Sequence, residues 1–199
     1  MTQRTSHAVE VLAAVLLVAA GSTARAAGGT VAGKVDVTPA KYLAETVVYL
    51  KGVPGNPAPR TRDMDQRGMQ FVPHLLVITA GDTVKFLNHD SVAHNVYSPD
   101  NEGYNLGSFK QGESRTYTFK SPGLYTQLCS IHPEMLGYIF VGDNPHAAAV
   151  DAKGRYELAN VPPGTYRLAV WNSHLKAPPD KSVTVTDGKT IQENLTLKR

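Results

Sequence analysis

Beyond residue 28 the chain alternates short apolar runs with polar turns. In Thr165–Trp171 the side chains of Tyr166, Leu168 and Val170 fall on one face of an extended chain, because side chains alternate along a strand. This period of two is typical of half-buried β-strands. Similar segments, rich in β-branched and aromatic residues, predict further strands over Thr30–Val37, Thr46–Leu50, Leu75–Thr79, Thr83–Leu87, Arg115–Phe119, Leu124–Cys129, Tyr138–Val141, Arg155–Leu158, Ser182–Thr186 and Ile191–Leu197.

Turn signals such as Gly81-Asp82, Pro122-Gly123 and Asp187-Gly188 separate these strands. After residue 28 the pattern predicts no amphipathic helix. Many short strands at this spacing are typical of sandwiches and barrels, so the sequence predicts an all-β protein.

Two segments dense in Pro and Gly mark the domain organisation, Gly52–Arg62 and Gly142–His146. Between them lie about 80 residues, the size of a small β-sandwich. We therefore predict one domain over 60–143, with two flanks outside it, 28–58 and 145–199, neither of which need be a domain alone.

The first 26 residues have the pattern of a secretory signal peptide. Arg4 supplies a positive start, an apolar run over Ala8–Ala20 is broken only by Glu10, and a small-x-small site ends at Ala26. We expect cleavage near Ala26 and a periplasmic or otherwise exported protein, with an uncleaved anchor as the alternative. No other long apolar run occurs, so we expect no transmembrane segment in the mature chain.

The net charge and the cysteine content limit the classes of function that this chain can have. The formal net charge is only +3, without a basic run, so we expect no nucleic-acid partner. The chain has a single cysteine, Cys129, although exported domains usually pair their cysteines or have none. A lone thiol in an oxidising compartment is buried, pairs with another chain, or is bound to something.

The neighbours of Cys129 favour the last of these. The stretch CSIHPEM places Cys129, His132 and Met135 at the spacing C-x-x-H-x-x-M, and His94 lies upstream in SVAHNV. Two imidazoles, a thiolate and a weak axial thioether are the ligands of a blue-copper centre, since sulfur suits Cu(I) while imidazole also accommodates Cu(II). Zinc fits less well, because its sites rarely use a thioether. The alternative is a buried cysteine with an incidental His and Met in a surface turn.

The run from Met64 to Gly142 resembles the cupredoxins, with a short ligand loop like that of the amicyanins. The resemblance extends through FVPHLLVITAGDTVKFLNHDSVAHNVYS, LGSFKQGESRTYTF and SPGLYTQLCSIHPEMLGYIFVG. It implies a Greek-key β-sandwich with one type 1 copper, held by His94, Cys129, His132 and Met135. It also implies single-electron transfer, without enzymatic activity, between redox protein partners such as a c-type cytochrome or a dehydrogenase.

Three residues are expected to support the ligands. Asn95 matches the asparagine that in this family ties the first histidine's strand to the cysteine loop, with Ser130 as its partner. Pro133 removes a backbone donor and stiffens the loop. The apolar side chains of Pro133, Leu136 and Leu75 are expected to form a small docking patch beside His132.

The flanks carry a second resemblance. The stretch VDAKGRYELANVPPGTYRLAVW is similar to the carboxypeptidase regulatory-like, transthyretin-like sandwich, and GTVAGKVDVTPAKYLAETVVYL looks like its opening strands. The copper domain is therefore expected to be inserted into a second sandwich, with two domains in tandem as the alternative. Two further functions stay open: a copper carrier or resistance protein without electron transfer, and an adhesion or scaffold module with structural copper.

Overall fold

The structure, a computed structural model, describes residues 28–55 and 57–199. The predicted signal peptide lies outside these residues. Within them the chain forms seventeen strands and a single short 3₁₀ helix, η1 (Ala40–Glu45), so the all-β fold class is confirmed. In the described part of the chain no helix is long and apolar enough to cross a membrane.

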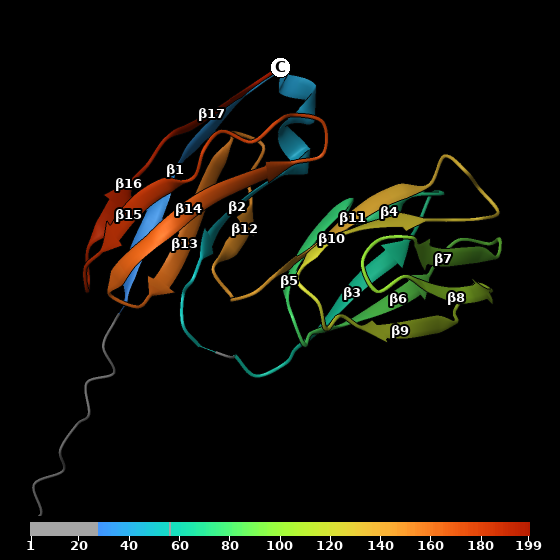
Figure 1. Ribbon diagram of the computed structural model, residues 1–199. Helices are drawn as coiled ribbons and strands as arrows, with labels where there is room; N and C mark the ends of the chain where they lie inside the picture. Colours follow the sequence, from blue (N-terminus) through green and yellow to red (C-terminus); the bar gives the residue numbers. More distant parts are fainter. Residues whose placement is uncertain (1–27, 56) are drawn as a thin grey trace, which may run out of the picture.

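The strands on either side of the central segment form what we call the flank sandwich, residues 28–51 and 147–199 (Figure 1). In one sheet β1 lies between β13 on one side and β16 and β17 on the other; in the other sheet the order is β12-β2-β14-β15. The bounds are β1 Gly29–Thr38, β2 Thr46–Lys51, β12 Ala147–Ala149, β13 Arg155–Val161, β14 Gly164–Asn172, β15 Lys181–Val185, β16 Thr190–Gln192 and β17 Leu195–Lys198.

Pairing across the flanks is extensive. β1 pairs antiparallel with β13 and parallel with β16 and β17, while β2 lies between β12 and β14. The two sheets enclose an apolar cluster with fully buried residues from both flanks, such as Val31, Leu50 and Leu168. Neither flank therefore encloses this core alone.

The strand predicted over Ile191–Leu197 is wrong in one respect, because it is two strands. β16 and β17 keep the same register on β1, but the ladder is interrupted at residues 193–194. There the side-chain Oδ1 of Asn194 accepts the Lys34 N–H at 2.9 Å. At Gly33 an added Cβ would lie 1.9 Å from the Glu193 carbonyl oxygen, so glycine permits the close approach of the two backbones.

The central segment forms a second structure, the central sandwich, residues 60–142. Its sheets have the orders β5-β11-β10-β7-β8 and β4-β3-β6-β9, and the chain crosses between them after β4, β5, β6, β8 and β9. The bounds are β3 Thr61–Gln66, β4 Phe71–Val72, β5 Leu75–Thr79, β6 Thr83–Asn88, β7 His94–Ser98, β8 Tyr104–Phe109, β9 Ser114–Thr118, β10 Gly123–Leu128 and β11 Leu136–Gly142.

The core of the central sandwich is rich in aromatic side chains. Phe119 is fully buried and meets Tyr125 and Tyr117 edge-on, with ring centroids 4.9 and 5.0 Å apart. Cys129 and Met135 belong to the same buried cluster. Since this cluster shares no residue with the core of the flank sandwich, the described chain has two separate hydrophobic cores.

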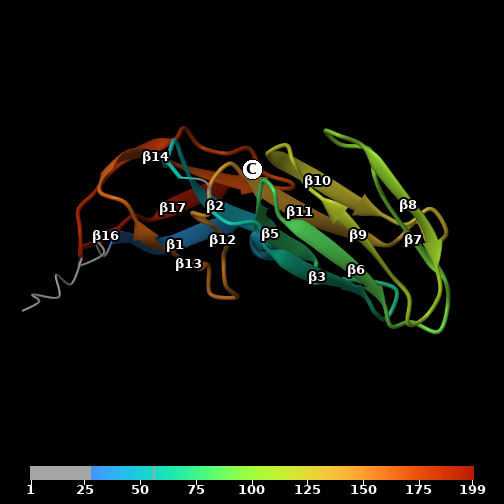
Figure 2. The ribbon, with the colours of Figure 1, turned by 90° about the horizontal axis from the view of Figure 1, so that it is seen from below.

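The two sandwiches meet side by side, as Figures 1 and 2 show. Phe140 of β11 packs against Tyr49 of β2 and Trp171 of β14, with centroids 4.9 and 6.2 Å apart. The Glu45 carboxylate lies 3.2 Å from the Nε2 atoms of both His74 and His174, one from each sandwich. These contacts join the two units at the side where the linkers cross, and the β10–β11 loop lies on the far side of the central sandwich (Figure 1).

Candidate metal centre

The four predicted ligands come from two parts of the central sandwich. His94 is the first residue of β7, where it pairs with Phe109 of β8, and it is completely buried. Cys129 follows directly after β10 and is 3% exposed. His132 lies half-buried in the β10–β11 loop, and the buried Met135 ends that loop, donating its N–H to the His132 carbonyl at 3.0 Å.

Three of these side chains converge. The Nδ1 atoms of His94 and His132 are 3.0 Å apart, and the Cys129 Sγ lies 4.0 and 3.9 Å from them. Among the described residues this is the one group of three His, Cys, Asp or Glu side chains whose ligand atoms all lie within 4.8 Å. The fourth predicted ligand, Met135, lies in the same buried cluster as Cys129.

Asn95 connects the strand of His94 to the loop of Cys129. Its backbone N–H points at the Cys129 Sγ from 3.4 Å, and its side-chain Oδ1 accepts the Ser130 N–H at 3.3 Å. Its Nδ2 donates to the Asn105 Oδ1 at 2.8 Å, which fixes the amide orientation. Ser130 thus takes part through its backbone and not through its hydroxyl. Pro133 is exposed in the loop.

One neighbour of the site was not predicted from the sequence. The Asp90 carboxylate lies 2.8 Å from the Nε2 of His94, the ring nitrogen on the side away from Cys129 and His132. Burial raises the pKa of Asp90, but hydrogen bonds from the Met69 and Gly68 N–H groups and from His94 outweigh it and hold that pKa below its usual value. The sequence signal that could have indicated this contact is the position of Asp90, an acidic residue four positions before the ligand His94.

The donor set suits copper. Two imidazoles and one thiol converge through Nδ1, Nδ1 and Sγ, and a buried thioether lies in the same core. Imidazole accommodates both copper oxidation states, while thiolate and thioether favour Cu(I). The residues present therefore fit a type 1 copper.

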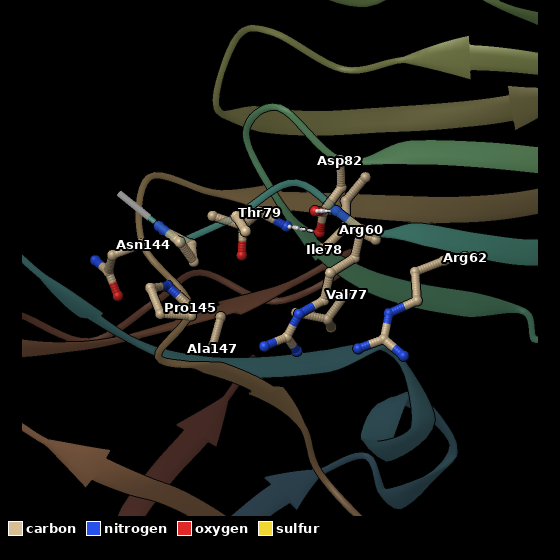
Figure 3. A pocket seen from close by; sticks show the side chains of 11 residues that line it. Arg60, Arg62, Val77, Ile78, Thr79, Asp82, Asn144, Pro145 and Ala147 are labelled. Atoms are coloured by element: carbon tan, nitrogen blue, oxygen red, sulfur yellow. Dashed lines mark hydrogen bonds between the residues drawn. The ribbon is translucent and has the colours of Figure 1, made fainter. Parts of the chain in front are cut away.

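A pocket with charged side chains lies at the start of β3, away from the metal centre. Figure 3 shows this pocket, which Arg60, Arg62 and Asp82 help to line near both linkers; the side chains of the two arginines extend away from the Asp82 carboxylate. The Asp82 carboxylate already accepts the backbone N–H groups of Arg60 and Thr79, at 2.7 and 2.9 Å (Figure 3). Because β3 runs from this pocket towards the Asp90 turn, the pocket lies at the opposite end of β3 from the metal centre.

Comparison with known families defines the class of this segment. Residues 60–142 match the family model of copper binding proteins, plastocyanin/azurin family. This segment of the chain is therefore a cupredoxin domain, and its cofactor is copper. Residues 146–193 match domain II of polysaccharide lyase family 4, so the predicted resemblance of the flanks to the carboxypeptidase regulatory-like sandwich stays a prediction.

Solved structures give likenesses of the same kind. A copper-containing nitrite reductase from Thermus scotoductus SA-01 is 32% identical over 45% of this chain and 24% of its own, with a TM-score of 0.40. The chain thus spans about a quarter of that protein. A purple cupredoxin from Nitrosopumilus maritimus is 28% identical over 40% of this chain and 98% of its own, with a TM-score of 0.38. An amicyanin variant in its Cu(I) form is 25% identical over 41% of this chain and 81% of its own, with a TM-score of 0.39. Because these TM-scores lie below 0.5, the family assignment rests on the family model.

Proposed function

We propose that this protein is an exported single-electron carrier, with copper held by His94, Cys129, His132 and Met135. When bound, copper supplies one-electron chemistry by alternating between Cu(II) and Cu(I). The observation that carries the proposal is the unequal exposure of these side chains. His94, Cys129 and Met135 are 0 to 3% exposed, and only His132 reaches the surface. His132 is thus the exit by which electrons leave towards a redox protein such as a c-type cytochrome or a dehydrogenase.

Burial also favours electron transfer over metal delivery. A carrier that hands on copper needs ligands that a recipient can reach one by one, whereas here two distant segments enclose the metal position. The Asn95 bonds hold those segments together, so copper could leave only by local opening of the loop. We therefore expect slow copper release and fast electron exchange.

The experiment uses the full chain without its predicted signal peptide. Copper(II) is added to the purified protein, and visible absorption and electron self-exchange between oxidised and reduced copies are measured. The proposal predicts an intense thiolate-to-copper band at one copper per chain, rapid self-exchange, and retention of copper against a chelator. A colourless protein, or copper lost to the chelator faster than electrons exchange, would contradict it.

The surface around His132 differs from the predicted docking patch. Leu136 and Leu75 are half-buried in β11 and β5, so of that patch only Pro133 is exposed. The exposed apolar side chains near the ligands are instead Ile131, next to His132, and Val92, two residues before His94, at 45 and 44% exposure. The docking patch that we propose is therefore Ile131, Val92 and Pro133.

The Ile131→Lys variant is expected to slow electron self-exchange by about tenfold, because two like charges then meet at the contact between copies. The rate is measured by NMR line broadening in mixtures of oxidised and reduced protein. Ser182→Lys adds the same charge to an exposed position of the flank sandwich and is the control. Equal rates in the two variants would rule out docking through Ile131.

We also propose that the copper domain, 60–143, is inserted into the domain of 28–58 and 145–199. The cross-flank pairing of β1 and β2 and the separate hydrophobic cores support insertion over a tandem arrangement. The flank domain then anchors or spaces the copper domain, whose β10–β11 loop stays free to meet a partner.

A further inference from the structure

We propose that Asp90 is a positioning residue of the copper site. Its carboxylate fixes the His94 ring with Nδ1 towards the metal, and its negative charge lowers the reduction potential. This inference deepens the proposed function and rests on it.

The orientation follows from hydrogen-bond chemistry. An ionised carboxylate only accepts hydrogen bonds, so the His94 Nε2 that lies 2.8 Å from Asp90 Oδ2 must carry the proton. In a neutral imidazole the other nitrogen, Nδ1, then has a free lone pair. That Nδ1 is the atom that lies 3.0 Å from His132 Nδ1 and 4.0 Å from Cys129 Sγ. Asp90 therefore selects the tautomer that presents Nδ1 to the metal.

Asp90 is itself held rigidly. Its Oδ1 accepts the Gly68 N–H at 2.6 Å, and its Oδ2 accepts the Met69 N–H at 2.8 Å. Its own N–H donates to Asn88 Oδ1 at 2.9 Å, and the Asn88 amide donates to the carbonyls of Val92 and Phe109. The carboxylate is thus tied to the β3–β4 turn, and the Asp90 backbone is tied to Asn88 of β6, which in turn bonds to β8. His94 therefore has one fixed partner.

The charge of Asp90 is not neutralised by another side chain. The nearby side chains of Arg67 and His89 both contact the Asp65 carboxylate, at 3.0 and 2.7 Å. Among the described residues, His94 is the only basic side chain within ion-pair distance of the Asp90 carboxylate. An electron that arrives at the metal meets a nearby negative charge in a poorly hydrated site, where Coulomb interactions are stronger than in water. The charge therefore favours the oxidised state.

The two histidines differ in this respect. In the described structure the His132 ring lies within hydrogen-bond distance of His94 and Cys129 only, and no carboxylate contacts it. Asp90 thus acts on the buried imidazole and leaves the surface imidazole free for contact with a partner. A purely structural role, anchoring the β3–β4 turn, is the competing explanation.

The test compares Asp90→Asn with Asp65→Asn in the full copper-loaded chain. Both changes remove one carboxylate charge from this end of the central sandwich, but only Asp90 contacts His94. Removing the Asp90 charge is expected to weaken the binding of Cu(II) at least tenfold relative to the binding of Cu(I). This loss lies within the range of affinity changes measured for residues that support metal ligands. For one electron this corresponds to a reduction potential raised by about 59 mV. Asp65→Asn should move the potential by a small fraction of that.

A second measurement needs no copper. The ¹⁵N shifts of His94 in the metal-free protein report the tautomer, which should be the Nε2–H form in the wild type and a mixture in Asp90→Ala. Equal potential shifts in the two Asn variants, or an unchanged tautomer in Asp90→Ala, would overturn the inference. A wild-type protein without a blue band would instead contradict the proposed function, while the tautomer measurement would still test Asp90.

Discussion

The Cys129→Ser variant is expected to lose the intense visible band of the copper-loaded protein and to bind Cu(II) at least about a hundredfold more weakly, since changes to residues that merely support a ligand already cost 10–100-fold. The band requires a thiolate, and a serine hydroxyl stays protonated near neutral pH. Cys129 is 3% exposed and serine is slightly smaller, so the fold should survive. Serine can also accept the Asn95 N–H that now points at the sulfur.

The control for this prediction is the neighbouring residue. Ser130 is exposed, and its backbone N–H makes the hydrogen bond to Asn95, so Ser130→Ala should keep the band and the affinity. Absorption and competitive copper titration measure both variants. A blue Cys129→Ser protein would mean that the thiol of Cys129 is not a ligand.

The Phe119→Ala variant is expected to lower the free energy of unfolding of the central sandwich by about 3–5 kcal/mol. Phe119 is fully buried, and its ring meets the edges or faces of Tyr125, Tyr117 and Tyr104 at centroid distances of 4.9 to 5.7 Å. Alanine leaves a cavity that these large rings cannot fill without leaving their packed positions.

Urea unfolding of the metal-free protein measures the loss, because bound copper would add a ligand-dependent term to the stability. Thr116→Ala, at an exposed position of β9, is the matched control and should change the stability little. Since the two cores share no residue, Leu168→Ala should act on the flank sandwich instead. Identical transitions in Phe119→Ala and Leu168→Ala would mean that the two sandwiches unfold as one unit.

Much of this structure is predictable from local sequence. Strands with a continuous apolar run, such as β5, or an alternating pattern, such as β14, lie within two residues of their predicted ends. The ligands on the β10–β11 loop are also accessible, because Cys129, His132 and Met135 are close in the chain. His94 was found only through its type and its family resemblance, as its approach depends on β7 lying beside β10.

Some strands were missed because their residues look polar, and others, such as β4 and β12, because they are only two or three residues long. β3 (TRDMDQ) and β8 (YNLGSF) have few buried side chains, and β3 is a strand because it pairs in parallel with β6 along six residues. η1 is too short to show helical periodicity. For Asp90 the sequence offers only its position four residues before His94, because its partners Gly68 and Met69 lie 22 and 21 residues earlier in the chain.

The path of the chain through the flank sandwich sets an order of assembly. β1 and β2 are made first, yet their partners β13, β14, β16 and β17 follow only after the whole central segment. Closing that long loop costs conformational entropy, which a folded central unit with its two ends close together reduces. We therefore expect the copper-binding unit to fold before the flank sandwich, because its folding holds the early strands near the point where the late strands begin.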